Sequence, residues 1–196
     1  MKKLFVVLSL LVFGVLSLSG AENETGKESV LVEASNALYI DVSYLVAAIQ
    51  AGGRGFGLGL GYEKAITPLF AILVGGGGMG VKLESDSGDI LNYAGVDGYL
   101  HGRIYPFKSA IGKFYLDAGA GYTYISMDYL GEKTGSHIGM VGGQIGFKLI
   151  FKWHFLIEPF FGYSYSFGTL NTPSALNIDH PQLGGFRYGL LLGAAF

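Results

Sequence analysis

An all-β fold, an antiparallel up-and-down barrel of eight strands, is predicted by three features of this sequence. Large apolar residues alternate with small or charged ones along eight segments, and a period of two indicates strands with two different faces. Glycine supplies 33 of the 196 residues, beside 14 Phe and 13 Tyr, whereas Pro supplies only 5. This composition is poor for helices and suits curved strands that carry aromatic side chains. The segments follow one another through connections that alternate, imperfectly, between short turns and longer loops, and we expect them to pair in hairpin order.

The segment 184–196, GGFRYGLLLGAAF, shows the alternation in a form that indicates which face is outward. Every second residue back from Phe196 is apolar as far as Phe186, whereas the alternate residues are mostly small and include Arg187. A narrow interior accommodates small side chains and a charge better than a row of rings. We expect this strand to close the barrel with its large side chains outside.

Seven further segments carry the same pattern. In 55–63 large apolar residues alternate with glycine, which leaves the glycine face room for large side chains from the opposite wall. The glycine run 75–78 removes the pattern from the middle of the third strand, so its register is not specified by the sequence. The predicted strands cover residues 38–49, 55–63, 69–83, 91–105, 114–126, 137–151 and 155–167.

The N-terminus predicts export. The first three residues include two lysines, residues 4–18 are almost entirely apolar, and residues 19–21 are small. This is the pattern of a secretory signal peptide, and we expect cleavage after Ala21. An apolar run of about 15 residues is shorter than the roughly 20 that a membrane-spanning helix needs. The predicted organisation is a signal peptide at 1–21, a polar periplasmic lead-in at 22–36 and the barrel at 37–196.

Charge and cysteine content exclude several function classes. The chain carries 13 Lys and Arg against 15 Asp and Glu, and removal of the signal peptide takes Lys2 and Lys3 away. Proteins that bind nucleic acid usually present a basic surface, so nucleic acid is not an expected partner. The sequence has no Cys, which excludes disulfides, thiolate metal sites and a lipid anchor on cysteine.

The signal peptide, the alternation and the closing strand that ends on Phe196 together resemble the small eight-stranded outer-membrane barrels of bacteria. This group includes the transmembrane domain of outer membrane protein A and the OmpX and OmpW types. The resemblance implies a monomer in the outer membrane of a Gram-negative-type envelope, in contact with outer-membrane lipid. It also implies that the last strand, with Phe196 and Tyr188, is the signal read by the barrel-assembly machinery. Loops 127–136 and 168–183 would be extracellular, and turns 64–68 and 152–154 periplasmic.

A soluble eight-stranded barrel of the lipocalin type, with its apolar face inward, is the alternative fold. In that fold the charged face would meet water. The charged face otherwise carries mostly Gly and Ser, and the apolar face is crowded with Tyr and Phe. Such crowding suits a convex, lipid-facing girdle better than a concave interior, so we favour the membrane barrel.

Charged residues on the strands are expected to point into the lumen, because a charge on the lipid face near the midplane costs about 2–4 kcal/mol. Ions in a narrow interior need partners, and eight strands leave room for little besides their own side chains. We expect a structural ion-pair network that fills the lumen, with a polar path for small solutes as the alternative. The predicted network residues are Asp41, Glu63, Asp97, Arg103, Asp117, Lys148, Glu158 and Arg187.

No motif predicts an enzyme, a cofactor or a metal site. Asp97, His101 and Arg103 share one strand face, but they form none of the motifs of the outer-membrane enzymes that act on lipid A. Glycines in 75–80 are followed by Val81 instead of the lysine of a phosphate-binding loop. The four histidines lack the mutual spacing of a metal site.

The sequence therefore predicts a small integral outer-membrane barrel with a filled polar lumen and a structural or surface-interaction role, such as adhesion or defence. Its external loops would contact an extracellular ligand or surface, as the OmpX resemblance implies. The alternative is a narrow channel for small solutes or small hydrophobic molecules, as in OmpW-type barrels.

Overall fold

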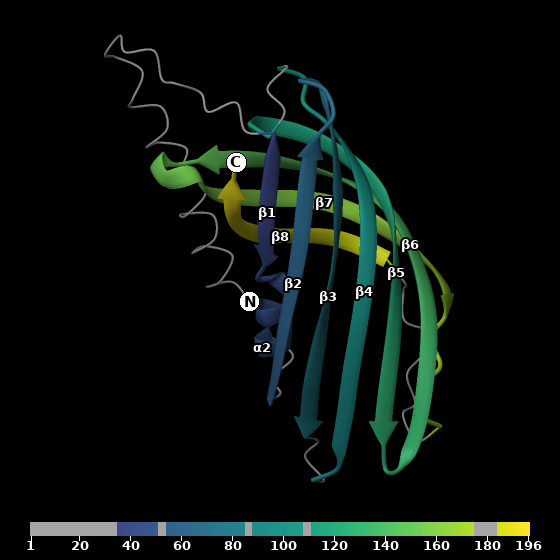
Figure 1. The fold of residues 1–196 in the computed structure, drawn as a ribbon. Coiled ribbons are helices and arrows are strands. Elements are labelled where there is room, and N and C mark those ends of the chain that lie inside the picture. Colours follow the sequence, from purple (N-terminus) through teal and green to yellow (C-terminus); the bar gives the residue numbers. More distant parts are fainter. Residues whose placement is uncertain (1–34, 51–53, 85–87, 108–110, 175–183) are drawn as a thin grey trace. The chain divides into compact units, whose positions relative to one another are not determined.

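A computed structural model describes residues 35–50, 54–84, 88–107, 111–174 and 184–196. Eight antiparallel strands, each hydrogen-bonded to the next and the last to the first, form a closed barrel (Figure 1). The predicted fold class is confirmed. The strands are β1 Asn36–Asp41, β2 Arg54–Ala65, β3 Phe70–Glu84, β4 Ile90–Ile104, β5 Lys113–Tyr129, β6 Glu132–Ile150, β7 Phe155–Thr169 and β8 Gly184–Ala195, with helix α2 at Ser43–Gln50 and the short helix η1 at Lys152–His154.

The predicted signal peptide 1–21 and residues 22–34 of the predicted lead-in lie outside the described residues, so export and cleavage stay predictions. Within the described part of the chain, no helix has the length and apolar character needed to cross a membrane.

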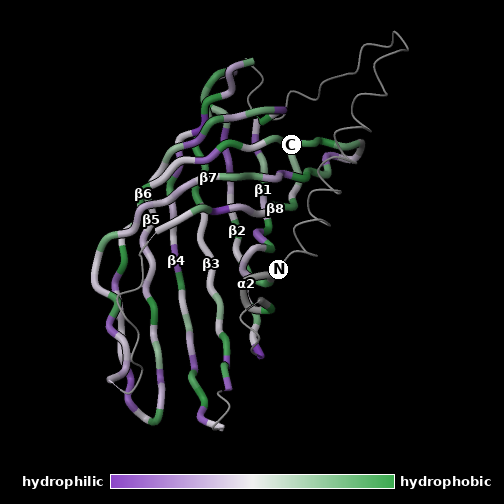
Figure 2. Tube along the Cα trace, turned by 180° about the vertical axis from the view of Figure 1, so that it is seen from behind, coloured by the Kyte–Doolittle hydropathy of each residue, from purple (hydrophilic) through white to green (hydrophobic). Residues whose placement is uncertain are grey.

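Each strand separates an outward apolar face from an inward face with charged and small residues. On β4, Val96 and Leu100 are each 58% exposed, whereas Arg103 on the other face is 0% exposed. Hydrophobic and hydrophilic residues alternate along the strands in Figure 2. The predicted assignment of the two faces, with the large apolar side chains outside, is therefore correct.

One end of the barrel contains both the first and the last strand residues of the described chain, and the other end contains neither. Asn36 and Phe196 exchange two backbone hydrogen bonds, each 2.8 Å long, at the end that we call the terminal rim. The opposite end, where β5 turns into β6, is the distal rim. Exposed aromatic residues lie on the outward face near both rims. They are Phe107, Phe151, Trp153, Phe155 and Phe196 toward the terminal rim, and Tyr122, Tyr124, Tyr163, Tyr165, Phe167 and Phe186 toward the distal rim.

The first strand is shorter than the predicted span of 38–49. β1 ends at Asp41, whose Oδ1 accepts a hydrogen bond of 2.8 Å from the backbone N–H of Ser43 and so helps to start α2. The ring of Tyr44 turns inward, into space that a side chain at Gly59 or Gly77 would occupy, and its hydroxyl donates to Asp97. This tertiary contact overrides the strand pattern of the sequence.

The predicted loop 127–136 is also wrong. β5 continues to Tyr129 and β6 begins at Glu132, joined by Leu130 and Gly131 with φ of 52° and 84°. Two residues with positive φ form the tight hairpin turn that matches strand twist. The polar residues of this segment therefore belong to a hairpin that extends the barrel wall at the distal rim.

The register of β3, which the glycine run left open, matches two tyrosine rings that lie against its inward glycines, one on the neighbouring strand β4 and one on α2. Gly75 and Gly77 face inward and pair with Gly61 and Gly59 of β2. A Cβ at Gly75 would lie 2.5 Å from Cζ of Tyr99, and one at Gly77 would lie 2.7 Å from Cζ of Tyr44. Each inward glycine thus leaves room for a tyrosine.

A charge placed on the outward face between the aromatic residues of the two rims should destabilise the barrel in a bilayer. For Leu100→Arg we expect a loss of about 2–4 kcal/mol in the free energy of unfolding, measured by urea titration in phospholipid vesicles. The matched control, Ile90→Arg, lies on the same face of β4 at its distal end and should cost less than about 1 kcal/mol. Equal losses in the two variants would contradict the predicted placement.

Candidate functional site in the barrel lumen

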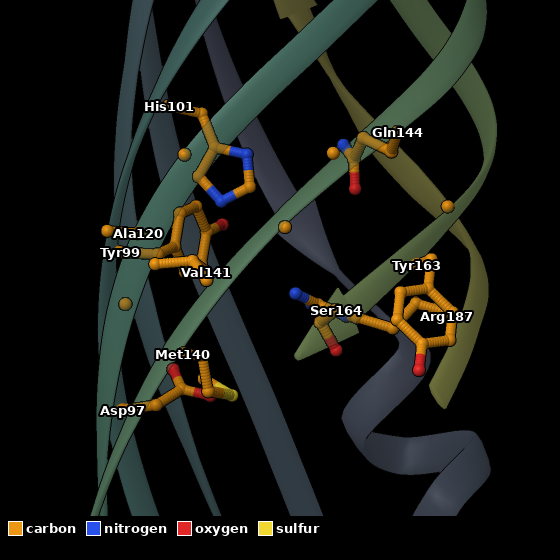
Figure 3. A pocket seen from close by; sticks show the side chains of 15 residues that line it. Asp97, Tyr99, His101, Ala120, Met140, Val141, Gln144, Tyr163, Ser164 and Arg187 are labelled. Carbon is orange, nitrogen blue, oxygen red and sulfur yellow. The ribbon is translucent and has the colours of Figure 1, made fainter. Parts of the chain in front are cut away.

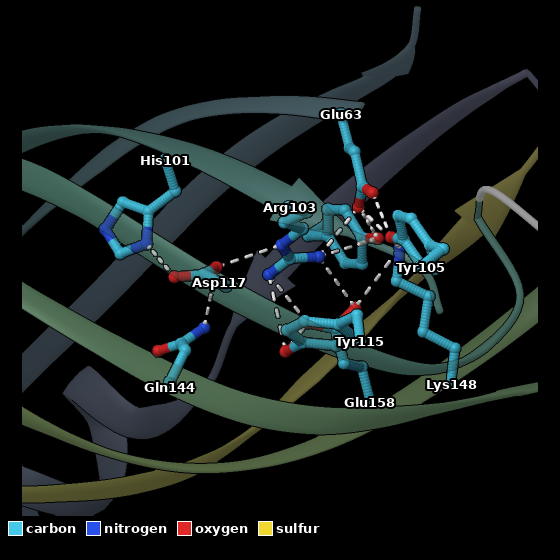
Figure 4. A network of polar contacts seen from close by, with 10 residues as sticks. Glu63, His101, Arg103, Tyr105, Tyr115, Asp117, Gln144, Lys148 and Glu158 are labelled. Carbon is cyan, nitrogen blue, oxygen red and sulfur yellow. Dashed lines mark hydrogen bonds and ion pairs between the residues drawn. The ribbon is translucent and has the colours of Figure 1, made fainter. Parts of the chain in front are cut away.

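Arg103 of β4 is the centre of a buried ion-pair network inside the barrel (Figure 4). Its guanidinium contacts three carboxylates: Nη1 lies 2.7 Å from Glu63 Oε2, Nη2 lies 2.8 Å from Glu158 Oε1, and Nε lies 3.1 Å from Asp117 Oδ2. All four side chains are 0% exposed. Arg103 and Asp117 are cross-strand partners on the paired strands β4 and β5, whereas Glu63 and Glu158 come from β2 and β7, which pair with neither of these strands.

Lys148 of β6 is the second cation of the network. Its Nζ lies 2.5 Å from Glu63 Oε2 and 3.9 Å from Glu158 Oε2, and it also contacts the hydroxyl of Tyr105. Each of the two glutamates therefore faces two cations. Buried carboxylates are tolerated only with such compensation.

Three tyrosines complete the hydrogen bonding of the glutamates. Tyr39 donates to Glu63 Oε2 over 2.5 Å, Tyr105 donates to Glu63 Oε1, and Tyr115 donates to Glu158 Oε1 over 2.5 Å. The guanidinium carbon of Arg103 also lies 4.3 Å from the ring centroid of Tyr115, within the range of a cation–π contact.

On the distal side, the network ends in a chain of three polar residues. His101 Nδ1 lies 2.5 Å from Asp117 Oδ1, and Gln144 Nε2 donates to Asp117 Oδ2 over 3.3 Å. Asp117 therefore links the ion-pair network of Arg103 to the part of the lumen that lies on its distal side.

An apolar cluster seals the lumen at the terminal rim. Ile111, in the turn between β4 and β5, has a φ of 62° and is 1% exposed, and Tyr105 at the start of this turn is 0% exposed. The turn therefore places two large side chains inside the barrel end. Ile111 belongs to a larger buried cluster that reaches past the network, where Leu73, Phe160 and Leu191 border a second cavity. The cluster consists of Ala37, Tyr39, Leu73, Ile111, Leu156, Phe160, Leu191 and Ala195.

A cavity, which we call the distal chamber, lies on the distal side of the network (Figure 3). Its empty volume is about 430 Å³, a value that includes open solvent. Asp97, His101, Gln144, Ser164 and Arg187 supply its polar lining. Asp97 accepts hydrogen bonds from the hydroxyl of Tyr44 and, over 2.9 Å, from the backbone N–H of Gly77. Arg187 has no hydrogen bond or ion pair with any described residue.

The structure thus separates the eight residues of the predicted charge network into two groups. Five of them, Glu63, Arg103, Asp117, Lys148 and Glu158, make the network. The other three lie apart from it: Asp41 accepts from the start of α2, while Asp97 and Arg187 line the distal chamber.

The sequence reasoning missed the polar partners of the network. Tyr39, Tyr115 and His101 lie on the same strand faces as the charged residues, and this shared register was the available signal. Tyr105 also has the register of Arg103, at the end of the predicted strand 91–105. Within the described residues, no group of three potential metal ligands occurs.

The two residues predicted to carry the assembly signal both present exposed side chains. Phe196 and Tyr188 are each 58% exposed. Nothing in the fold tests recognition by the assembly machinery, which stays a prediction.

No protein-family model and no curated protein matches the chain. Among solved structures, Acinetobacter baumannii CarO is similar with a TM-score of 0.46 and 13% identity, over 83% of this chain and 98% of that one. Ail, the attachment invasion locus protein of Yersinia pestis, is similar with a TM-score of 0.46 and 9% identity, over 84% and 98%. Both are eight-stranded outer-membrane barrels, the class that the sequence resembles. Similarity at this distance transfers no ligand, partner or activity to this chain.

Removal of the central cation should destabilise the barrel strongly. In Arg103→Met, three buried carboxylates lose their shared partner, and we expect the free energy of unfolding to fall by about 3–5 kcal/mol. Arg187→Met, which removes the same group from a site without an ion pair, should cost less than about 1 kcal/mol. Urea titration of both variants in vesicles measures the difference, and similar losses would show that the network is not the stabilising element.

Proposed function

We propose that this protein is an integral outer-membrane β-barrel of a Gram-negative-type envelope, with a sealed lumen and a role at the cell surface. The outward face supports membrane insertion. Leu60, Val74, Val96, Leu100 and Phe161 are each at least half exposed around the wall. Soluble monomers rarely expose continuous apolar surface of this extent, whereas a lipid-facing barrel requires it.

The soluble lipocalin-type alternative needs the opposite arrangement. Its apolar face would line the interior, but here the interior holds Arg103, Glu63 and Glu158 with no exposure. The inside-out distribution of apolar and charged side chains favours the membrane barrel.

The sealed lumen is the observation that carries the proposed role. A solute moving from the distal chamber to the terminal rim would have to displace the ion pairs of Arg103 and then the apolar cluster around Ile111. Breaking buried ion pairs without replacement is costly. We therefore assign the function to surfaces outside the lumen.

The distal rim offers an ordered surface for such a role. The segment 170–174, which follows β7, is held against the extended β5–β6 hairpin by side-chain hydrogen bonds. Asn171 Nδ2 donates to the carbonyl of Gly135 over 2.7 Å, and the backbone N–H of Ser174 donates to Glu132 Oε2 over 2.9 Å. A hairpin braced in this way is suited to contact another surface, which supports a surface-interaction role over a purely structural one.

A second candidate function is passage or storage of small molecules, and the distal chamber favours it. The chamber is lined by Asp97 and by Arg187, a cation that forms no ion pair with the residues that the structure describes. Passage across the membrane would additionally require the network and the apolar cluster to open.

The conductance of the purified barrel in planar lipid bilayers distinguishes the two candidates. We expect no discrete channels from folded, heat-modifiable protein, because side chains fill the lumen. A porin of known conductance, reconstituted in the same way, is the positive control that shows that the assay detects an open barrel. Steady unitary channels from the unaltered protein would overturn the proposal of a sealed lumen.

A further inference from the structure

A strand position in the barrel wall is left vacant between β2 and β8. The last pair of β1 with β2 is Asp41–Gly59, and the last pair of β1 with β8 is Asp41–Leu191. Both neighbours continue toward the distal rim, β2 as far as Arg54 and β8 as far as Gly184. Among the described residues, no backbone hydrogen bond satisfies the facing edges of these two extensions.

The helix α2 lies behind the vacancy, on the lumen side. A Cβ on the inward Gly57 of β2 would lie 2.8 Å from Cβ of Tyr44, and one on the inward Gly189 of β8 would overlap Oγ of Ser43. That Oγ is buried without a hydrogen-bond partner among the described atoms. Among the described residues, the helical conformation of this segment therefore leaves the facing edges of β2 and β8 and the hydroxyl of Ser43 without hydrogen bonds.

The sequence that follows β1 fits the vacancy. If the pairing of β1 with β2 and with β8 continued by one residue, Val42 would lie between Leu58 of β2 and Leu190 of β8, on the outward face. Both of these neighbours are exposed leucines. Ser43 would then point inward between Gly57 and Gly189, which leave it space.

The next outward position of the continued register belongs to Tyr44. It would lie between Phe56 and Tyr188, which are 64% and 58% exposed. An aromatic row would result across three neighbouring strands. This match explains why alternation predicts a strand over 38–49, although the structure shows a helix from Ser43.

We propose that the segment 42–50 exchanges between α2 and an extension of β1 that fills the vacancy. The proposal rests on the proposed membrane insertion, because a bilayer penalises strand edges without hydrogen bonds. The contact of Tyr44 with Asp97 holds the helical state. In the extended state Tyr44 leaves Asp97, whose carboxylate lines the distal chamber, whereas the ion-pair network stays in place. The exchange thus frees a carboxylate of the chamber and keeps the lumen sealed.

The first test removes the hydroxyl that holds the helix. In isotope-labelled Tyr44→Phe in lipid nanodiscs, backbone NMR shifts of residues 43–46 should show an extended population raised roughly tenfold or more, because a hydrogen bond to a charged group is lost. The matched control, Tyr39→Phe, loses a hydroxyl bonded to Glu63 in the network and should leave these shifts unchanged.

The second test traps the extended state in a chain that has no native cysteine. Directly paired positions are close enough for a disulfide, so Tyr44→Cys with Tyr188→Cys should cross-link under mild oxidation. Tyr44→Cys with Tyr122→Cys, an outward tyrosine on β5, should not. The cross-linked barrel should stay silent in planar bilayers.

Two results together would overturn the exchange: only helical shifts for residues 43–46 in Tyr44→Phe, and no cross-link in the Tyr188 pair. Failure of the proposed function would look different. In that case the unaltered protein would fail to insert into nanodiscs or would form channels, whichever conformation residues 43–46 adopt.

Discussion

The buried guanidinium of Arg103 is the interaction on which the interior of this barrel depends. It is 0% exposed and contacts carboxylates from β2, β5 and β7 at 2.7–3.1 Å. Removal of a guanidinium from water is costly unless its donors and charge are compensated. The three carboxylates need the same compensation, so Lys148 and the surrounding tyrosines become necessary partners. One buried cation thus explains why the narrow lumen is filled with polar side chains, and why these side chains have partners for their charges and hydrogen bonds.

Glycine makes this filling possible. The interior of an eight-stranded barrel has little spare width, and each ring that enters it needs a neighbouring position without a side chain. Tyr44 uses Gly59 and Gly77, Tyr99 uses Gly75, and Tyr115 lies against Gly146. The abundance of glycine is therefore a packing requirement that complements the abundance of tyrosine.

The interior changes character from one rim to the other. Around Ile111 it is apolar and closed, at Arg103 it is ionic and closed, and on the distal side it opens into a chamber bordered by Asp97 and Arg187. The elements that depart from a regular barrel, namely α2 and the extended β5–β6 hairpin, both lie toward the distal rim. Rigid closure at one end and irregular structure at the other are consistent with a protein that acts on one side of its membrane.

The sequence by itself determined the number of strands, their order and the side of each strand that faces outward, because period-two alternation is local and persists through each segment. It also placed all eight predicted charges on the inward register. Only the tertiary structure decided which of them meet, since Arg103 and Glu63 are far apart in sequence and pair across the lumen. The register of β3 and the helix at Ser43 likewise depend on contacts with other elements. The local sequence pattern specifies which face of a strand each side chain occupies. Contacts between side chains of different strands across the lumen form only when the barrel has closed.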